Sequence, residues 1–155
     1  MEEKFRTKSA VMVMLIRKNN KGEEEILLQK RQNTGYKDGY WDFSASGHVE
    51  KNESMKQAVV REAKEELNVD IELKNVHFIT MIHKYSDDDI YYNGFFKVTN
   101  WNNNPIVNEP EKCSEIKWFK LDSIPEKTIE DRIDAINNYK KNIPYSEIGW
   151  EYIDI

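Results

Sequence analysis

Two long apolar runs open the chain and predict a β-hairpin. Residues 9–19, SAVMVMLIRKN, are apolar and partly β-branched, and residues 24–32, EEILLQKRQ, form a second run of the same kind. The polar segment NNKGEE between them has the composition of a turn, so we expect the two runs to pair. Residues 40–44, YWDFS, are short, aromatic and compatible with a further strand.

The second half of the chain contains three more candidate strands. Apolar and aromatic residues dominate residues 70–85 and 90–101, which predict two long strands joined by the acidic turn SDDD. Residues 115–121, EIKWFKL, predict another strand. The tail, IPYSEIGWEYIDI, is rich in aromatic residues, so we expect it to pack against the rest of the protein.

Two segments have the spacing of amphipathic helices. The first runs from Glu53 to about Leu67. Asn52 is suited to cap its start, and Asn68 is suited to end it in the left-handed conformation. The second covers residues 129–141. Strands outnumber helices, and each helix comes late in its half of the chain, so the pattern favours a mixed sheet flanked by helices.

Composition and charge narrow the class of protein. The 155 residues, with 39% hydrophobic and 33% charged side chains, fit one globular domain over residues 1–155 and exclude simple disorder. The formal net charge of −5 provides no basic surface for duplex nucleic acid, although a small anion could still bind locally.

The cysteine content and the N-terminal residues bear on the cellular compartment of the protein. The single cysteine, Cys113, rules out a disulfide framework within the chain and suits a reducing environment. The start of the chain carries acidic residues where a signal peptide is basic, and no window approaches the roughly 18 apolar residues of a membrane span. We therefore expect a cytoplasmic protein without membrane contact.

Three glutamates stand at unusual positions in the first predicted helix. Glu62, Glu65 and Glu66 lie in its last turns, where the helix already carries partial negative charge and where like charges repel one another. With about 100° per residue, Glu66 lies about 40° and Glu65 about −60° from Glu62. The trio therefore borders the apolar face of the helix instead of lying opposite to it.

The position of this acidic trio points to a cation. Half-buried, unpaired carboxylates are costly, and hard divalent ions such as Mg²⁺ or Mn²⁺, which take oxygen ligands, remove that cost. The alternative is a charged helix whose glutamates pair with Lys56, Lys64 or Arg61, because acidic clusters often form solvated faces.

A wider pattern contains the trio. Gly47 is followed after five residues by Glu53, and seven residues later by REAKEELNV, which begins at Arg61. This resembles the Nudix box, G-x5-E-x7-R-E-U-x-E-E-x-G-U with U aliphatic, over Gly47 to Val69. The departure is Asn68 in place of glycine, and asparagine is the next most tolerant residue for a left-handed position. A second departure is the leading FSASG, where many Nudix hydrolases have Pro-Gly-Gly.

The resemblance implies a fold and a reaction. The fold is α+β, a Nudix-type α/β/α sandwich with a mixed β-sheet flanked by helices. The reaction is hydrolysis of a phosphoric anhydride in a nucleoside di- or triphosphate derivative, by attack of a metal-activated water at phosphorus. Carried over by position, Glu62, Glu65, Glu66 and the Gly47 carbonyl imply ligands for Mg²⁺ or Mn²⁺. Glu53 and Arg61 imply a pair that fixes the loop to the helix.

Other side chains are candidates for substrate contact and proton transfer. Glu111 is the candidate base, because related enzymes often supply an acid from the loop before this strand; Glu109 and Glu115 compete with it. Arg31 can fork onto phosphate or form a strand-end salt bridge, and His48 follows the box glycine or is simply solvated. Four aromatic residues could stack on a base, with core packing as the alternative: Tyr40, Tyr36, Trp41 and Tyr85.

Two alternatives to the hydrolase stay open at this point. A non-catalytic nucleotide-binding module with the Nudix fold usually loses box carboxylates, and this chain keeps all of them. An enzyme similar to isopentenyl diphosphate isomerase needs a cysteine near the box, and Cys113 is far along the chain. The sequence does not choose the nucleotide substrate. The oligomeric state is also open, and a homodimer is allowed.

Overall fold

Strand β1 (Lys8–Lys18) is the centre of the computed structural model, which describes residues 2–152. Ala10 to Ile16 are all buried, because both faces of this strand are covered. Its partners change along its length. β6 pairs with β1 from Lys8 to Leu15, β4 pairs with it from Ala10 to Val13, and β2 pairs with it from Ile16 to Lys18.

The described residues form an eight-stranded mixed sheet in the order β3-β2-β1-β6-β5-β8, with β4 paired to β1 and β7 paired to β2. The β1–β6 and β5–β8 pairs are parallel and the other strand pairs are antiparallel. The strands are β1, β2 (Glu24–Arg31), β3 (Trp41–Phe43), β4 (Ala45–His48), β5 (His77–Ser86), β6 (Asp89–Val98), β7 (Cys113–Lys120) and β8 (Tyr145–Ile148). The helices are α1 (Met55–Leu67) and α2 (Glu130–Lys141), with short 3-10 helices η1 (Leu73–Asn75) and η2 (Trp150–Tyr152).

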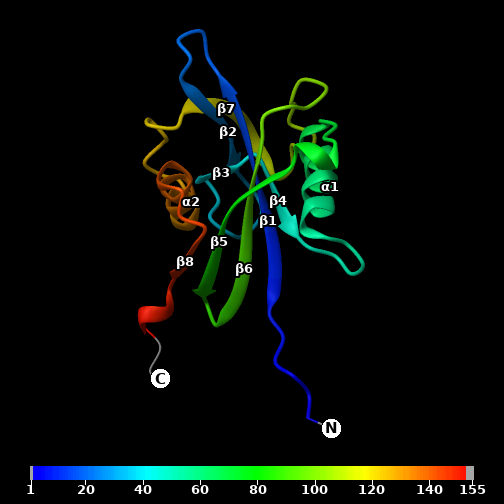
Figure 1. Cartoon of the computed structure of the whole chain (residues 1–155), viewed down its shortest axis with the longest axis vertical. Helices are drawn as coiled ribbons and strands as arrows, with labels where there is room; N and C mark the ends of the chain where they lie inside the picture. The colour runs from blue at the N-terminus through cyan, green and yellow to red at the C-terminus, as the bar shows by residue number, and fades with distance from the viewer. Residues whose placement is uncertain (1, 153–155) are drawn as a thin grey trace.

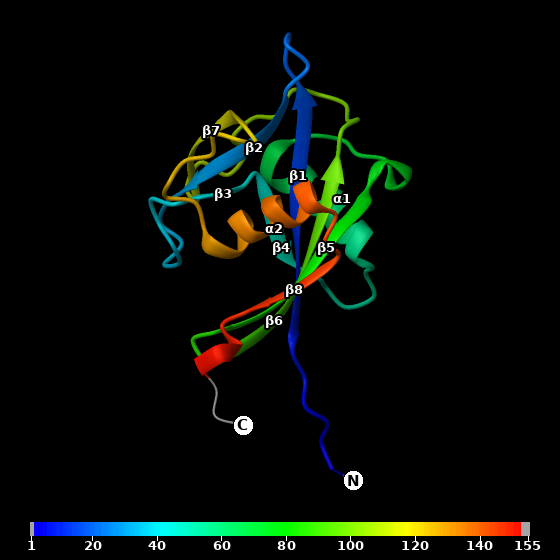
Figure 2. The same ribbon diagram turned by 60° about the vertical axis from the view of Figure 1, so that its left-hand side comes forward.

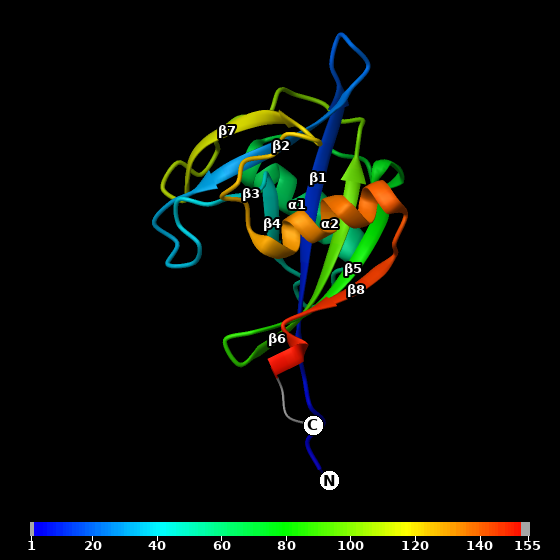
Figure 3. The ribbon, with the colours of Figure 1, turned by 90° about the vertical axis from the view of Figure 1, so that its left-hand side faces the viewer.

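The two helices cover opposite faces of the sheet (Figures 1 and 3). Alternate residues of β1 divide between two cores: Val11 and Val13 pack with α1, whereas Met12 and Met14 pack with α2. Figure 2 shows the sheet twisting between its upper part and the β5–β6 end. This arrangement confirms the predicted fold class, a mixed sheet flanked by helices. Among residues 2–152, no helix is long and apolar enough to cross a membrane.

The ends of α1 test the predicted helix limits. Its cap is Ser54, whose hydroxyl accepts a hydrogen bond from the Gln57 N–H while the Gln57 side chain accepts one from the Ser54 N–H. The prediction of Asn52 as the cap is wrong, because Asn52 lies in the preceding turn with φ 66°. Asn68 does end the helix in the left-handed conformation, with φ 54° and ψ 35°.

The strand predicted over residues 70–85 is shorter than expected. Its first part forms η1, and only residues from His77 onward join the sheet. The tail does pack down, as β8 beside β5 and as Trp150, whose indole N–H donates to the His83 carbonyl at 2.9 Å. Residues 153–155 of the predicted tail lie outside the described residues.

Candidate active site

Arg61 fastens helix α1 to the segment that precedes it. Its guanidinium forks onto Glu53, with Nε to Oε2 at 2.7 Å and Nη2 to Oε1 at 2.9 Å. Nη2 also donates to the His48 carbonyl at 3.1 Å, at the end of β4. The Arg61 guanidinium lowers the pKa of Glu53 to about 2, chiefly through this hydrogen-bonded pair. The structure thus brings together the two residues predicted as a supporting pair.

Glu62 lies against the backbone of Gly47. A β-carbon at Gly47 would fall within 2.8 Å of both Glu62 carboxylate oxygens, so only glycine permits this approach. The Glu62 side chain is 12% exposed and accepts a hydrogen bond from Arg61 Nη1 at 2.6 Å. Burial raises the pKa of Glu62 despite this ion pair.

Glu66 occupies the next turn of α1, at the side of the helix that faces β4. Its Oε2 accepts a hydrogen bond from the Ser46 N–H at 2.8 Å. Burial raises the pKa of Glu66 well above its ordinary value, and the charges of Glu62 and Asp42 add to the shift. Glu62 and Glu66 therefore form a pair of carboxylates that the fold holds in an unfavourable environment.

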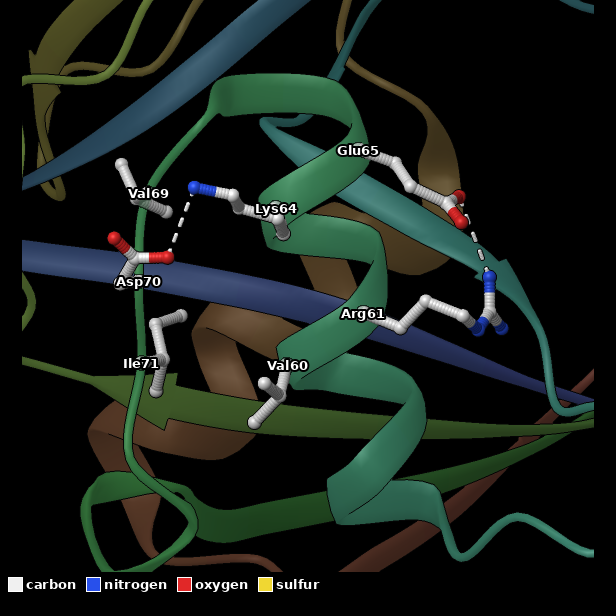
Figure 4. A pocket seen from close by; sticks show the side chains of 7 residues that line it. All are labelled: Val60, Arg61, Lys64, Glu65, Val69, Asp70 and Ile71. Atoms are coloured by element: carbon white, nitrogen blue, oxygen red, sulfur yellow. Dashed lines mark hydrogen bonds and ion pairs between the residues drawn. The ribbon is translucent and has the colours of Figure 1, made fainter.

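Glu65 is the exposed member of the trio, and its charge acts on Glu62. Its side chain is 54% exposed and lies 3.4 Å from Arg61 Nη1. Figure 4 shows Glu65 and Arg61 extending from the same side of α1, while Lys64 reaches the opposite side and pairs with Asp70 at 3.0 Å. The predicted alternative of ion pairing is thus realised at Arg61, although Lys64 pairs outside the trio.

The loop before β7 docks on the C-terminal end of α1. The Asn108 side-chain amide donates to the Glu65 carbonyl at 2.9 Å, and the Asn108 N–H donates to the Glu66 carbonyl at 3.1 Å. Helix C-terminal carbonyls lack intrahelical partners, so Asn108 satisfies two of them. Glu109 follows directly, is 32% exposed, and contributes to the raised pKa of Glu66. The Glu111 side chain is exposed in the adjoining turn.

Whether these residues suit a divalent ion depends on their donor chemistry. Among residues 2–152, no group of three or more His, Cys, Asp or Glu side chains is arranged to hold a metal ion. In this structure Arg61 supplies the positive charge beside Glu62 and Glu65. The half-buried carboxylates of Glu62 and Glu66, next to the Gly47 backbone, nevertheless offer the hard oxygen donors that Mg²⁺ and Mn²⁺ take.

A cleft of about 720 Å³ opens beside Glu66 and β4. Arg31 and His48 line it, as does Tyr36, whereas Tyr40 is not among the lining residues and packs near Lys37 and Lys127 instead. Arg31 donates to Asp42 at 3.0 Å and to the Tyr36 carbonyl at 2.8 Å, so the predicted salt bridge exists within the cleft wall. Of these two aromatic candidates, Tyr36 therefore lines the cleft and Tyr40 does not.

A buried ion network forms part of the cleft wall, and the sequence pattern did not reveal it. Arg132 donates to Asp42 at 2.7 Å and to both carboxylate oxygens of Asp131 at 2.9 Å. Lys84 donates to Asp131 at 3.1 Å from β5. The two carboxylates are fully buried. The available signal was an Asp-Arg pair at the start of the second predicted helix.

The segment from β4 to the end of α1 carries the arrangement of a Nudix pyrophosphohydrolase, and comparison with known proteins gives the same class. The family profile described as NUDIX domain matches residues 6–139. The chain belongs to the NUDIX domain family.

Individual relatives agree with this assignment. An uncharacterised Nudix hydrolase of Listeria innocua is 29% identical over 130 residues, covering 82% of this chain and 68% of the relative. An 8-oxo-dGTP diphosphatase of Proteus vulgaris is 32% identical over 78 residues, covering 50% of this chain and 67% of the relative. The crystal structure of a MutT NUDIX hydrolase from Burkholderia pseudomallei has a TM-score of 0.75 at 21% identity, covering 86% of this chain and 98% of that one. This last likeness confirms the fold.

Proposed function

We propose that this Nudix pyrophosphohydrolase is a divalent-metal-dependent enzyme that cleaves the pyrophosphate linkage of a nucleoside di- or triphosphate derivative. The observation that carries the proposal is the Glu62–Glu66 pair, two carboxylates whose pKa burial raises beside a large cleft. A fold keeps such a pair at a cost in stability, and a bound cation would offset that cost.

In this proposal Glu62, Glu65 and Glu66, with the Gly47 carbonyl, hold Mg²⁺ or Mn²⁺. When bound, the ion neutralises the diphosphate, orients it and lowers the pKa of water. Arg61 would give up its contacts with Glu62 and Glu65 and keep its existing fork on Glu53. The trio then needs only side-chain rotation, because α1 fixes the three backbones.

A carboxylate near the reacting water takes its proton. Glu111 is the residue predicted from sequence, but its side chain is exposed in the turn. The position of Glu109 favours it as the base, because Asn108 anchors it to α1 and its charge acts on Glu66. The variants Glu109→Gln and Glu111→Gln separate the two candidates, since only replacement of the base should lower kcat by about 10²-fold or more.

Substrate contacts follow from the cleft. Arg31 and His48 line it and are proposed to contact phosphate oxygens. Of the aromatic candidates from the sequence, Tyr36 lines the cleft and is proposed to stack on the base in preference to Tyr40. A nucleotide substrate is supported by the relative from Proteus vulgaris, which acts on 8-oxo-dGTP as its name states. A single domain, a cytoplasmic location and a homodimer stay predictions.

The isomerase alternative depends on a reactive cysteine. Cys113 is 8% exposed, and burial raises the pKa of its thiol, with a further contribution from the Glu66 charge. A thiol with a raised pKa is a poor nucleophile and a poor acid–base group near neutrality. This observation favours the hydrolase. The binding-module alternative would be favoured if the protein hydrolysed no diphosphate-containing nucleotide.

The test is hydrolysis of a panel of nucleoside triphosphates, dinucleoside polyphosphates and nucleotide sugars with Mg²⁺, followed by product identification. Glu66→Gln and Glu65→Gln should each lower kcat by orders of magnitude, because each removes a proposed ligand. Glu72→Gln, an exposed glutamate paired only with Lys74, is the matched control and should retain activity. Absence of turnover on every diphosphate with folded wild-type protein would overturn the proposal.

A further inference from the structure

The cleft contains a buried hydrogen-bond acceptor that the reaction so far does not use. Asn93 lies on β6, lines the cleft and is only 3% exposed. Its side-chain Nδ2 donates to Asp131 Oδ2 at 3.1 Å. Its Oδ1 is buried and accepts no hydrogen bond from any residue in the described part of the chain. A buried carbonyl without a partner is uncommon in folded proteins.

Electrostatics fix which end of the Asn93 amide faces Asp131. Burial on its own would raise the pKa of Asp131, but the charges of Arg132 and Lys84 outweigh it and hold the pKa below its ordinary value. Asp131 is therefore ionised and can only accept hydrogen bonds. The amide nitrogen must face this carboxylate, which leaves the oxygen as the unpartnered end of Asn93, a residue that lines the cleft.

A donor stands beside this acceptor. Lys84 binds the other oxygen of the same carboxylate, at 3.1 Å, and donates to the Tyr36 hydroxyl at 3.1 Å. An ammonium group has three donors, so Lys84 retains one beyond these two contacts. Tyr36 adds an aromatic ring at the cleft. Acceptor, donor and aromatic ring together match the polar edge and the face of a nucleobase.

We propose that Asn93 Oδ1 accepts a hydrogen bond from an N–H group of the substrate base, which makes Asn93 a specificity-determining residue. The inference rests on the proposed function, since it assumes a nucleotide in this cleft. A buried acceptor that gains its partner only from the correct substrate discriminates against substrates that lack the donor. We expect a substrate whose base carries this N–H group to have a kcat/KM about 10- to 100-fold higher than one that lacks it.

The experiment compares each nucleotide with an analogue that lacks one base donor: UTP with N3-methyl-UTP, GTP with N1-methyl-GTP, and ATP with purine riboside triphosphate. For the nucleotide turned over best, the wild type should prefer the parent by about 10- to 100-fold. Asn93→Leu, of similar size and without polar atoms, should reduce that preference to about 1. Asn93→Thr keeps a hydroxyl donor for Asp131 and serves if the leucine variant does not fold.

Tyr92→Leu is the matched control, because Tyr92 lies next to Asn93 on the opposite face of β6 and is 39% exposed. It should leave the preference at the wild-type value. No preference in the wild type, or an unchanged preference in the Asn93 variants, would overturn the inference. The inference would also be overturned if the preference that depends on Asn93 were for the parent nucleotide over its 2′-deoxy or 3′-deoxy analogue, because the donor would then be a sugar hydroxyl.

Failure of the proposed function gives a different result. If no compound is hydrolysed, binding of the non-hydrolysable α,β-methylene forms of the same pairs is measured by calorimetry. A parent that binds about 10- to 100-fold tighter than its donor-free analogue, only when Asn93 is present, supports the base contact without catalysis. Equal binding of both members of every pair contradicts it.

Discussion

Replacement of Gly47 by alanine should displace one carboxylate and little else. Gly47 does not adopt a left-handed backbone, so an alanine fits its conformation. The farther Glu62 oxygen lies 2.8 Å from the added β-carbon, and ordinary contacts begin at 3.4 Å, so that oxygen must move by about 0.6 Å and the nearer one by more. Displacements near 1 Å in a catalytic constellation lower rates by about 10²-fold.

The assay is kcat for the best substrate of the nucleotide panel, together with thermal unfolding. We expect kcat to fall by about 100-fold, while the unfolding free energy changes by about 1 kcal/mol or less, because a flexible side chain absorbs the clash. Gly47→Ala combined with Glu62→Gln completes a double-mutant cycle. The combined loss should be much smaller than the product of the two single losses. Fully multiplicative losses, or unchanged kcat in Gly47→Ala, would refute the reasoning.

Three further predictions concern the same helix. Burial raises the pKa of Glu66, so between the ordinary Glu pKa and the raised value the folded protein keeps a proton that the unfolded chain has lost. The stability of the folded protein therefore falls as the pH rises through this range. In the metal-free protein, Glu66→Gln should raise Tm above the wild-type value by more at pH 8 than at pH 4.5, and an equal rise at both would contradict this. Asn108→Ala should lower kcat by about 10-fold through loss of the helix contact, whereas Asn104→Ala, an exposed residue of the same loop, should not; equal rates in both variants would remove the positioning role. Chelation by EDTA should abolish turnover and added Mg²⁺ should restore it and raise Tm at pH 8, and turnover that persists in EDTA would contradict metal dependence.

Local patterns predicted most of the fold because they depend on neighbours in the chain. Alternation along β1, the turn after it and the left-handed Asn68 are all readable from a few consecutive residues. The predicted cap of α1, Asn52, lies two residues before the observed cap, Ser54, since both are good cap residues and only tertiary structure selects one. The shortened β5 has a similar reason, because residues 73–75 form a 3-10 helix that strand propensity does not exclude.

The candidate site divides in the same way. The Nudix box lies within one strand, loop and helix, so its resemblance to the family motif could imply roles for Glu53, Arg61 and the acidic trio from the sequence. The wall of the cleft could not be read in this manner, because Asp42 and Arg132 are 90 positions apart and Asn93 meets Asp131 across 38. Charged residues separated so widely carry no mutual signal in a single sequence. The exposure of Glu65 was likewise not foreseen, since the helical wheel places it beside the apolar face.

The central claim is that the acidic trio binds a divalent ion, and titration with Mn²⁺ followed by electron paramagnetic resonance tests it most directly. Wild-type protein should deplete the signal of free Mn²⁺ saturably at pH 8. The Glu62→Gln, Glu65→Gln and Glu66→Gln triple variant, if folded by circular dichroism, should leave that signal unchanged. Equal depletion by the wild type and the triple variant would contradict the claim.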